Sequence, residues 1–221
     1  ADVGNVKLWS AEAPNLYLLT VTLLDENGKT CEVSRVEVGF RQFEMIDKIK
    51  QDHPQIKFQF TEGGPRLQDC YDSDWCKWGT MMAKAFNHGC ESFTGWNLML
   101  DEEGRPNVGH CYCAGLVTLN SRTKELSYSG QFRAFEHFSH FIQNGAKIYR
   151  SHVNNDGHCV SNFRSLKFET VSLVAENPDG TLIMQVINPN AEKRQCQYFY
   201  KGNWWYFDVM ENSISTLVFE D

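Results

Sequence analysis

The chain has 221 residues and a formal net charge of -7, with 42% hydrophobic and 22% charged residues. This composition is typical of a globular protein, and the acidic balance argues against nucleic acid or an anionic membrane surface as the main partner. No apolar run approaches the roughly 20 residues that a membrane-spanning helix needs. The N-terminus has neither the basic nor the apolar region of a signal peptide, so we expect no such leader in this chain.

Aromatic residues make up 13% of the chain and include six Trp. Aromatic rings stack on the apolar C–H faces of sugars, which makes carbohydrate a candidate ligand, although most such rings lie in protein cores. The eight Cys are scattered. The Cys111-x-Cys113 spacing beside His110 is poor for tetrahedral zinc, so we expect no metal and no cofactor. Disulfides and buried free thiols both remain open for these residues.

The first 45 residues have the alternation typical of β-strands. Residues 16–24 and 31–38 flank a turn that contains Asn27-Gly28, which predicts an antiparallel hairpin. A lone hairpin is only marginally stable in water, so we expect it to pack on another part of the protein. Residues 47–53 then predict a short polar helix that ends at Pro54.

The segment from residue 56 to about residue 142 follows the order strand, helix, strand, helix. The strands are predicted at residues 56–60 and 92–100, and the helices at residues 75–88 and 132–141. Asp72, Ser73 or Asp74 is available to cap the first helix, and Gly89 ends it. This order predicts a βαβα unit of a parallel sheet or an eight-stranded barrel.

The last third of the chain returns to short strands separated by turn clusters, which predicts an antiparallel sandwich. The strands are expected at residues 147–153, 168–175, 181–187, 195–200 and 213–219. The predicted fold class is therefore mixed α/β and all-β. We expect a hairpin or immunoglobulin-like segment over residues 1–45, barrel units over residues 46–146 and a sandwich over residues 147–221.

Glu62 is the most specific candidate for catalysis. It follows a predicted strand directly and is itself followed by two glycines, Gly63 and Gly64. Barrel enzymes place catalytic groups at the carboxyl ends of their strands, and glycines let backbone or ligand approach closely. Taken alone, such a Glu is more often an ordinary solvated side chain, so the pattern needs further support.

Three ordered motifs supply that support. They are Phe58-Gln-Phe-Thr-Glu-Gly63, Gly95-Trp-Asn-Leu together with the loop to Asn107, and the aromatic segment at residues 128–142. Together they resemble the last two strands and the last helix of the barrel in glycoside hydrolase family 30, which includes glucosylceramidases and endo-β-1,6-glucanases. Residues 174–180 extend the resemblance into the sandwich. The family relationship implies a β-glucosidic substrate such as glucosylceramide or β-glucan, with a role in carbohydrate or sphingolipid metabolism.

The resemblance also implies roles for particular residues. Glu62 would be the nucleophile of a retaining β-glycosidase, and Trp96 would lie against the sugar in the -1 subsite, although a Trp of the barrel core is the alternative. Asn97, Asn107 and His110 would contact the substrate. The family further implies a secreted, lysosomal or periplasmic location.

Two features depart from the family pattern. Residues 110–113 read His-Cys-Tyr-Cys where the family usually has Asn-Phe-x-Asp, so the substrate contacts of this loop are open. No Asn-Glu pair precedes Glu62 on a barrel-like strand, although a retaining site needs an acid/base carboxyl about 5 Å from the nucleophile. There is also no room for six further βα units of roughly 30 residues each. We therefore expect the isolated chain to be inactive, or to need a partner chain or a homo-oligomer that completes the barrel.

The N-terminal segment resembles a different family. Leu8-Trp-Ser10, Pro14-Asn-Leu-Tyr17 and Gly39-Phe-Arg41 are similar to the immunoglobulin-like domain that precedes the barrel in glycoside hydrolase family 2, the β-galactosidase and β-glucuronidase group. Two segments that resemble glycosidases thus meet near residues 45 and 46.

Two other functions remain open. The first is a non-catalytic carbohydrate-binding or scaffold module, in which Trp204-Trp-Tyr206 would form an exposed aromatic platform, although such a cluster more often enters a strand core. The second is an incomplete fragment without an independent function, whose uncovered strand edges would promote association.

Overall fold

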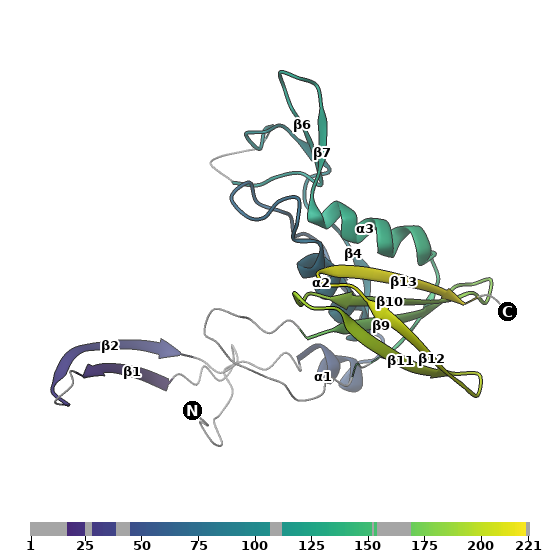
Figure 1. Cartoon of the computed structure of the whole chain (residues 1–221), viewed down its shortest axis with the longest axis horizontal. Helices are drawn as coiled ribbons and strands as arrows, with labels where there is room; N and C mark the ends of the chain where they lie inside the picture. The colour runs from purple at the N-terminus through teal and green to yellow at the C-terminus, as the bar shows by residue number, and fades with distance from the viewer. Residues whose placement is uncertain are drawn as a thin grey trace. The chain divides into compact units, whose positions relative to one another are not determined.

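The computed structural model describes residues 17–24, 28–38, 45–106, 112–151, 153 and 169–219. The chain divides into two compact units, Ala1–Gln55 and Ile56–Asp221. Many antiparallel strands and few helices make up the described parts (Figure 1). None of these described helices is long and apolar enough to cross a membrane.

The first unit contains the expected hairpin. Strand β1 (Tyr17–Leu24) pairs antiparallel with β2 (Thr30–Val38), and Tyr17 lies opposite Val38. Gly28 between them has a φ of 79°, the left-handed conformation that a tight turn requires and that glycine adopts without strain. Helix α1 (Met45–Asp52) begins two residues before the predicted start at residue 47 and ends one residue before the predicted end at residue 53.

The second unit begins with a strand–helix–strand motif. Strand β3 (Phe58–Phe60) is followed by α2 (Trp75–Asn87) and β4 (Cys90–Phe93), and β3 and β4 are parallel. The rings of Phe60 and Phe93 stack with centroids 4.1 Å apart. Gly89 ends α2 with a φ of 87°, as predicted.

The strand predicted over residues 92–100 is divided in two. Strand β4 ends at Phe93, and β5 (Met99–Leu100) begins after a break. Asn97 lies in this break with a φ of 60°, and a left-handed residue cannot continue an extended strand. Strand β5 joins a separate sheet with β6 (Val117–Leu119) and β7 (Leu126–Tyr128), neither of which was predicted.

The core of this unit lies between two helices and a four-stranded sheet. Helix α3 (Gly130–Phe141) follows Ser129, whose hydroxyl accepts a hydrogen bond from the N–H of Phe132 at 3.0 Å. The sheet has the order β13-β10-β9-β8, with bounds Lys147–Tyr149 (β8), Val171–Glu176 (β9), Leu182–Asn188 (β10) and Ser213–Phe219 (β13). Helices α2 and α3 lie against this sheet (Figure 1). The buried contact is made by Trp78, Met82, Phe138, Leu173, Ile187 and Ile214.

A second hairpin completes the unit. Strand β11 (Arg194–Tyr200) pairs antiparallel with β12 (Asn203–Val209) (Figure 1). The rings of Tyr198 and Tyr200 contact Phe219 of β13, with centroid distances of 5.1 and 5.3 Å. The four strands predicted after residue 168 are thus present, but β12 was not predicted as a strand.

The described sheets have two, four, two, two and three strands, and none of them closes. The only parallel strand pairs among them are β3 with β4 and β5 with β6. The strand–helix–strand prediction around α2 is therefore confirmed. The broader expectation of a partial eight-stranded barrel is not confirmed by these sheets.

Candidate active site

The candidate site lies where the parallel strands β3 and β4 end. Glu62 follows the last residue of β3 by two positions, and Trp96 follows the last residue of β4 by three. Two hydrogen bonds continue the pairing beyond both strands: the N–H of Thr94 donates to the carbonyl oxygen of Phe60 at 2.8 Å, and the N–H of Trp96 donates to that of Gly63 at 3.0 Å. The segments that carry Glu62 and Trp96 therefore lie side by side.

The two glycines after Glu62 allow this close contact. A Cβ atom on Gly64 would lie 2.7 Å from the carbonyl oxygen of Trp96, and a Cβ atom on Gly63 would lie 2.8 Å from the ring of Phe60. Both distances are shorter than side-chain carbons tolerate. The glycines were expected to let backbone or ligand approach closely, and in this structure the approaching group at Gly64 is the backbone of Trp96.

Gln131 holds the same loop from the first turn of α3. Its side chain is fully buried, and its Nε2 donates to the carbonyl oxygen of Gly63 at 2.8 Å. Its Oε1 is buried without a hydrogen-bond partner. The sequence pattern did not single out this residue, because a polar residue in the first turn of a helix is ordinarily solvated.

The side chains of the predicted site differ in their environments. Glu62 is exposed, and no described residue forms a hydrogen bond or an ion pair with its carboxylate. Trp96 is 46% exposed, whereas Asn97 is half-buried and its Nδ2 has no hydrogen-bond partner. The structure thus brings Glu62, Trp96 and Asn97 to one strand-end region. Asn107 and His110 lie outside the described residues.

The segment after Trp96 is held by the strand that follows. The carbonyl oxygen of Asn97 accepts a hydrogen bond from the N–H of Leu116, and that of Leu98 accepts one from Val117, both at 3.0 Å. These bonds fix the backbone on either side of the left-handed turn at Asn97. The position of the Asn97 amide is therefore set by backbone contacts and not by a partner of its own.

Asp74, one of the three residues predicted to be available as a cap, precedes α2, but its side chain does not cap the helix. Its side chain makes no capping hydrogen bond. Its Oδ2 instead accepts a hydrogen bond from Nε1 of Trp78 at 2.9 Å and lies 3.5 Å from Nζ of Lys77. Burial raises the pKa of the Asp74 carboxyl above its ordinary value, although the charge of Lys77 and the Trp78 hydrogen bond lower it. Its other oxygen, Oδ1, is buried without a partner.

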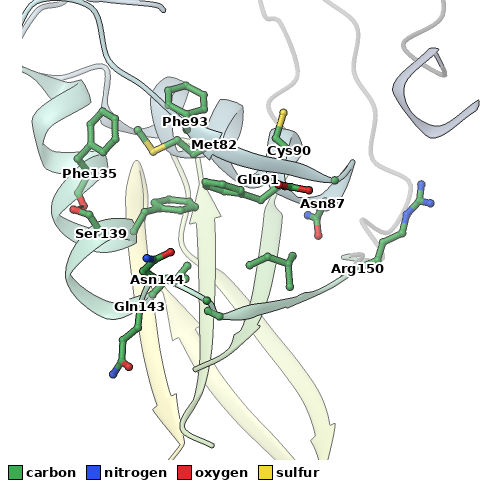
Figure 2. A pocket seen from close by; sticks show the side chains of 17 residues that line it. Met82, Asn87, Cys90, Glu91, Phe93, Phe135, Ser139, Gln143, Asn144 and Arg150 are labelled. Carbon is green, nitrogen blue, oxygen red and sulfur yellow. Dashed lines mark hydrogen bonds between the residues drawn. The ribbon is translucent and has the colours of Figure 1, made fainter. Parts of the chain in front are cut away.

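A cavity of about 740 Å³ lies away from Glu62, and its lining comes from α2, β4, α3 and the segment that leads through β8. Figure 2 shows Met82, Phe93 and Phe135 on one side of this cavity and Glu91 and Arg150 on another. Neither Glu62 nor Trp96 lines it. The lining combines apolar side chains with polar and charged ones. Strand β4, which contributes to it, has β3 as its single neighbour in the described sheets.

Metal ligands do not gather in the described residues: no group of three or more His, Cys, Asp or Glu side chains lies together there. Six described cysteines, at positions 31, 70, 76, 90, 113 and 196, are free thiols. Cys76 is the buried member of this set, and burial raises its pKa to about 12. Such a thiol carries almost no thiolate at neutral pH and is a poor metal ligand or nucleophile.

The N-terminal segment is similar to known β-galactosidases. A family model described as "Glycosyl hydrolases family 2" matches residues 1–41. A β-galactosidase from Clostridium acetobutylicum is 50% identical over 48 residues, which are 22% of this chain and 5% of that protein. One from Vibrio vulnificus is 56% identical over 41 residues, or 19% of this chain and 4% of that protein. The chain thus spans about a twentieth of the curated relatives that it matches.

Solved structures share the fold over most of the chain. SrfJ from Salmonella typhimurium superposes with a TM-score of 0.69 and 23% identity, over 81% of this chain and 38% of that one. An endo-β-1,6-glucanase superposes with a TM-score of 0.65 and 22% identity, over 78% of this chain and 38% of that one. The catalytic domain of a GH30 xylanase C from Talaromyces cellulolyticus gives a TM-score of 0.52 at 18% identity, over 74% of this chain and 41% of that one.

The N-terminal segment is thus similar to glycoside hydrolases of family 2, and the chain shares its fold with these solved structures, among them a glucanase and a GH30 xylanase. This agrees with both resemblances in the sequence. At these identities the structural similarity establishes the fold and leaves the substrate and the catalytic residues to be tested.

Proposed function

We propose that this chain carries the nucleophile half of a retaining β-glycosidase site, with Glu62 as the nucleophile. The observation that carries the proposal is the position of Glu62 just beyond the carboxyl end of β3, beside the Trp96 segment that leaves the parallel strand β4. Groups at the carboxyl ends of parallel strands converge on one edge of a sheet, which is where barrel enzymes assemble their sites.

The chemistry requires two carboxyl groups. Glu62 attacks the anomeric carbon and forms a glycosyl-enzyme, while a second carboxyl about 5 Å away protonates the departing oxygen and later activates water. Glu62 is exposed to solvent and free of ion pairs with described residues, so its carboxylate is available to attack. The proposed acid/base carboxyl comes from outside this chain, because the sequence has no matching residue.

The rest of the site is proposed to come from further strands. SrfJ and the endo-β-1,6-glucanase are each matched over 38% of their length, so most of their fold has no counterpart here. We assign residues 46–146 to the last units of such a barrel. The edge of β4 that faces away from β3, and the cavity beside it, would receive the next strand, supplied by a partner chain or a second copy.

Trp96 and Asn97 are assigned to the sugar in the -1 subsite. The indole of Trp96 is exposed enough to cover a sugar ring. Asn97 is assigned by the resemblance, and its Nδ2 is a buried donor without a partner beside the same loop. Asn107 and His110 remain substrate contacts by resemblance. A β-glucosidic substrate such as β-glucan or glucosylceramide fits the family resemblance.

A substrate with an activated leaving group tests the nucleophile assignment. A dinitrophenyl β-glucoside needs no acid to protonate its leaving group, so its first bond cleavage depends on the nucleophile alone. We expect this chain to release dinitrophenolate and Glu62→Gln to lose that release, while Glu192→Gln, the same change at an exposed position before β11, keeps it. Equal rates above the uncatalysed background for the unchanged chain and Glu62→Gln would refute the nucleophile assignment. Background rates for both proteins would show that the isolated chain needs the further strands.

A further inference from the structure

The hairpin of β11 and β12 has one side covered with exposed aromatic rings. Side chains alternate between the two sides of the hairpin, and one side carries Tyr198 and Tyr200, which pack on Phe219. The opposite side carries Phe199, Trp204 and Tyr206, which are 60%, 58% and 65% exposed. We call this opposite side the aromatic face; its members are Gln195, Gln197, Phe199, Trp204, Tyr206 and Asp208.

The register of the hairpin orders the aromatic face into three cross-strand pairs. Phe199 lies opposite Trp204, Gln197 opposite Tyr206, and Gln195 opposite Asp208. Successive pairs are about 7 Å apart, because same-side residues of a strand are two positions apart. The rings of Phe199 and Trp204 contact each other with centroids 5.3 Å apart. One aromatic pair, one mixed pair and one polar pair therefore follow one another along this side of the hairpin.

The aromatic face combines apolar rings with polar amide groups, and it carries little net charge. Its single formal charge, on Asp208, is paired with Nζ of Lys193 at 2.7 Å. The amides of Gln195 and Gln197 each offer two donors and one acceptor oxygen. A nucleic acid or an anionic membrane would require a basic surface, which these six side chains do not provide.

A groove of about 580 Å³ adjoins the aromatic face. Trp204, Tyr206, Gln195 and Gln197 contribute to its lining. Residues from β9 and β10 also line it, as do Cys196, Tyr198 and Phe207 from the other side of the hairpin. Ser151 and Ser172 add hydroxyl groups to the lining and hydrogen-bond to each other at 3.0 Å. A concave site with aromatic walls and a few polar groups is typical of small-molecule recognition.

We infer that the aromatic face binds a neutral oligosaccharide, separately from the proposed site at Glu62. The apolar C–H faces of gluco-configured sugars stack on Trp204 and Tyr206, and the Gln amides exchange hydrogen bonds with the hydroxyl groups beside the rings. Neutral sugars match a face whose one charge is already paired. The site has its own residues and does not depend on Glu62 being a nucleophile.

Trp205 provides a matched internal control. It neighbours Trp204 on the same strand and is 51% exposed, but it lies on the side of the hairpin that faces away from Phe199 and Tyr206. Removing either indole costs a similar amount of exposed aromatic surface. Only the loss of Trp204 alters the aromatic face.

Calorimetry with cellohexaose and laminarihexaose tests the inference. The titrations use the full chain carrying Glu62→Gln, so that hydrolysis cannot contribute and loss of the proposed nucleophile cannot affect the result. We expect binding of one of these oligosaccharides, weakened about tenfold or more by Trp204→Ala and by Tyr206→Ala. Trp205→Ala should leave the affinity within about twofold, and Trp204→Phe should retain most of it because an aromatic ring remains.

Far-UV circular dichroism and the unfolding midpoint establish that each variant is folded. Absence of binding by the folded chain would overturn the inference, as would an equal loss of affinity in Trp204→Ala and Trp205→Ala. Conversion of an oligomer to a monomer by Trp204→Ala, without any oligosaccharide binding, would also overturn it and would identify the face as a contact between copies.

Discussion

The backbone N–H of Trp96 donates to the carbonyl oxygen of Gly63 at 3.0 Å, and this bond joins the segments that follow two parallel strands. It places Gly63, the residue after the proposed nucleophile Glu62, against the backbone of Trp96, the residue proposed to stack on the sugar. Main-chain contacts therefore fix the spacing of Glu62 and Trp96. These contacts require that positions 63 and 64 carry no Cβ atom.

Gly64→Ala tests this dependence. The new methyl group would lie 2.7 Å from the carbonyl oxygen of Trp96, so one of the two segments must move. We expect a loss of about 1–3 kcal/mol in the free energy of unfolding, as is usual for overpacking. Urea denaturation measures it, with the exposed Thr61→Ala as a control that should change stability by less than about 0.5 kcal/mol. Equal stability of the two variants would contradict the close contact.

Gln131→Ala removes the side chain that holds this loop from α3. The carbonyl oxygen of Gly63 loses the amide that lies 2.8 Å away, and a buried group without its partner costs about 1–3 kcal/mol. We expect lower stability in urea and a slower release of dinitrophenolate. Arg133→Ala, an exposed position on the same helix, is the comparison. Unchanged stability and release in Gln131→Ala would show that the loop is held by other contacts.

His137 should make stability depend on pH. Burial lowers its pKa below the ordinary value of 6.5, although nearby Glu136 raises it. Its Nδ1 lies 2.9 Å from Oγ1 of Thr216, whose hydroxyl donates to Oε1 of the buried Gln185. The unfolded chain binds this proton more readily than the folded chain, so stability should decrease as pH falls below about 6.5.

Urea denaturation at about pH 7.5 and about pH 5.5 measures this effect, because these values lie on either side of the ordinary histidine pKa. The decrease should be smaller in His137→Gln, while His140→Gln, an exposed position on the same helix, should retain it. The same decrease in all three proteins would assign the pH dependence to other groups.

Thiol labelling should distinguish the cysteines. Burial raises the pKa of Cys76 to about 12, and its Sγ lies 3.6 Å from the carbonyl oxygen of Asn188, whereas Cys31 and Cys70 are exposed. We expect iodoacetamide at pH 8 to modify Cys31 and Cys70 in the folded chain and to leave Cys76 unmodified until urea is added. Peptide mapping by mass spectrometry gives the order in which the cysteines are modified. Labelling of Cys76 as fast as Cys70 would contradict its burial.

The regular elements of this chain were predictable where a period runs through several residues. The apolar spacing in α2 results from burying one face of the helix, and α2, β1, β2 and β10 lie near their predicted bounds. Strands of three residues, such as β6 and β7, are too short to show a period. Their place is set by pairing with distant backbone, which no local pattern encodes.

The candidate site was predictable only in part for related reasons. Glu62 and Trp96 were found because each follows a strand within a recognisable motif. The left-handed Asn97, which divides the predicted strand, and Gln131, which reaches Gly63 across the fold, depend on tertiary contacts. The exposure of Trp204 was one of two alternatives, because the same aromatic sequence fits either side of a strand until the register is known.

The central claim is that Glu62 is the nucleophile, and trapping of a glycosyl-enzyme tests it most directly. A dinitrophenyl β-glucoside with fluorine in place of the sugar 2-hydroxyl forms the covalent intermediate but hydrolyses slowly. Peptide mapping by mass spectrometry after incubation should find the sugar on Glu62, and on no residue in Glu62→Gln. A sugar attached to another residue, or equal labelling of the chain and Glu62→Gln, would contradict the claim.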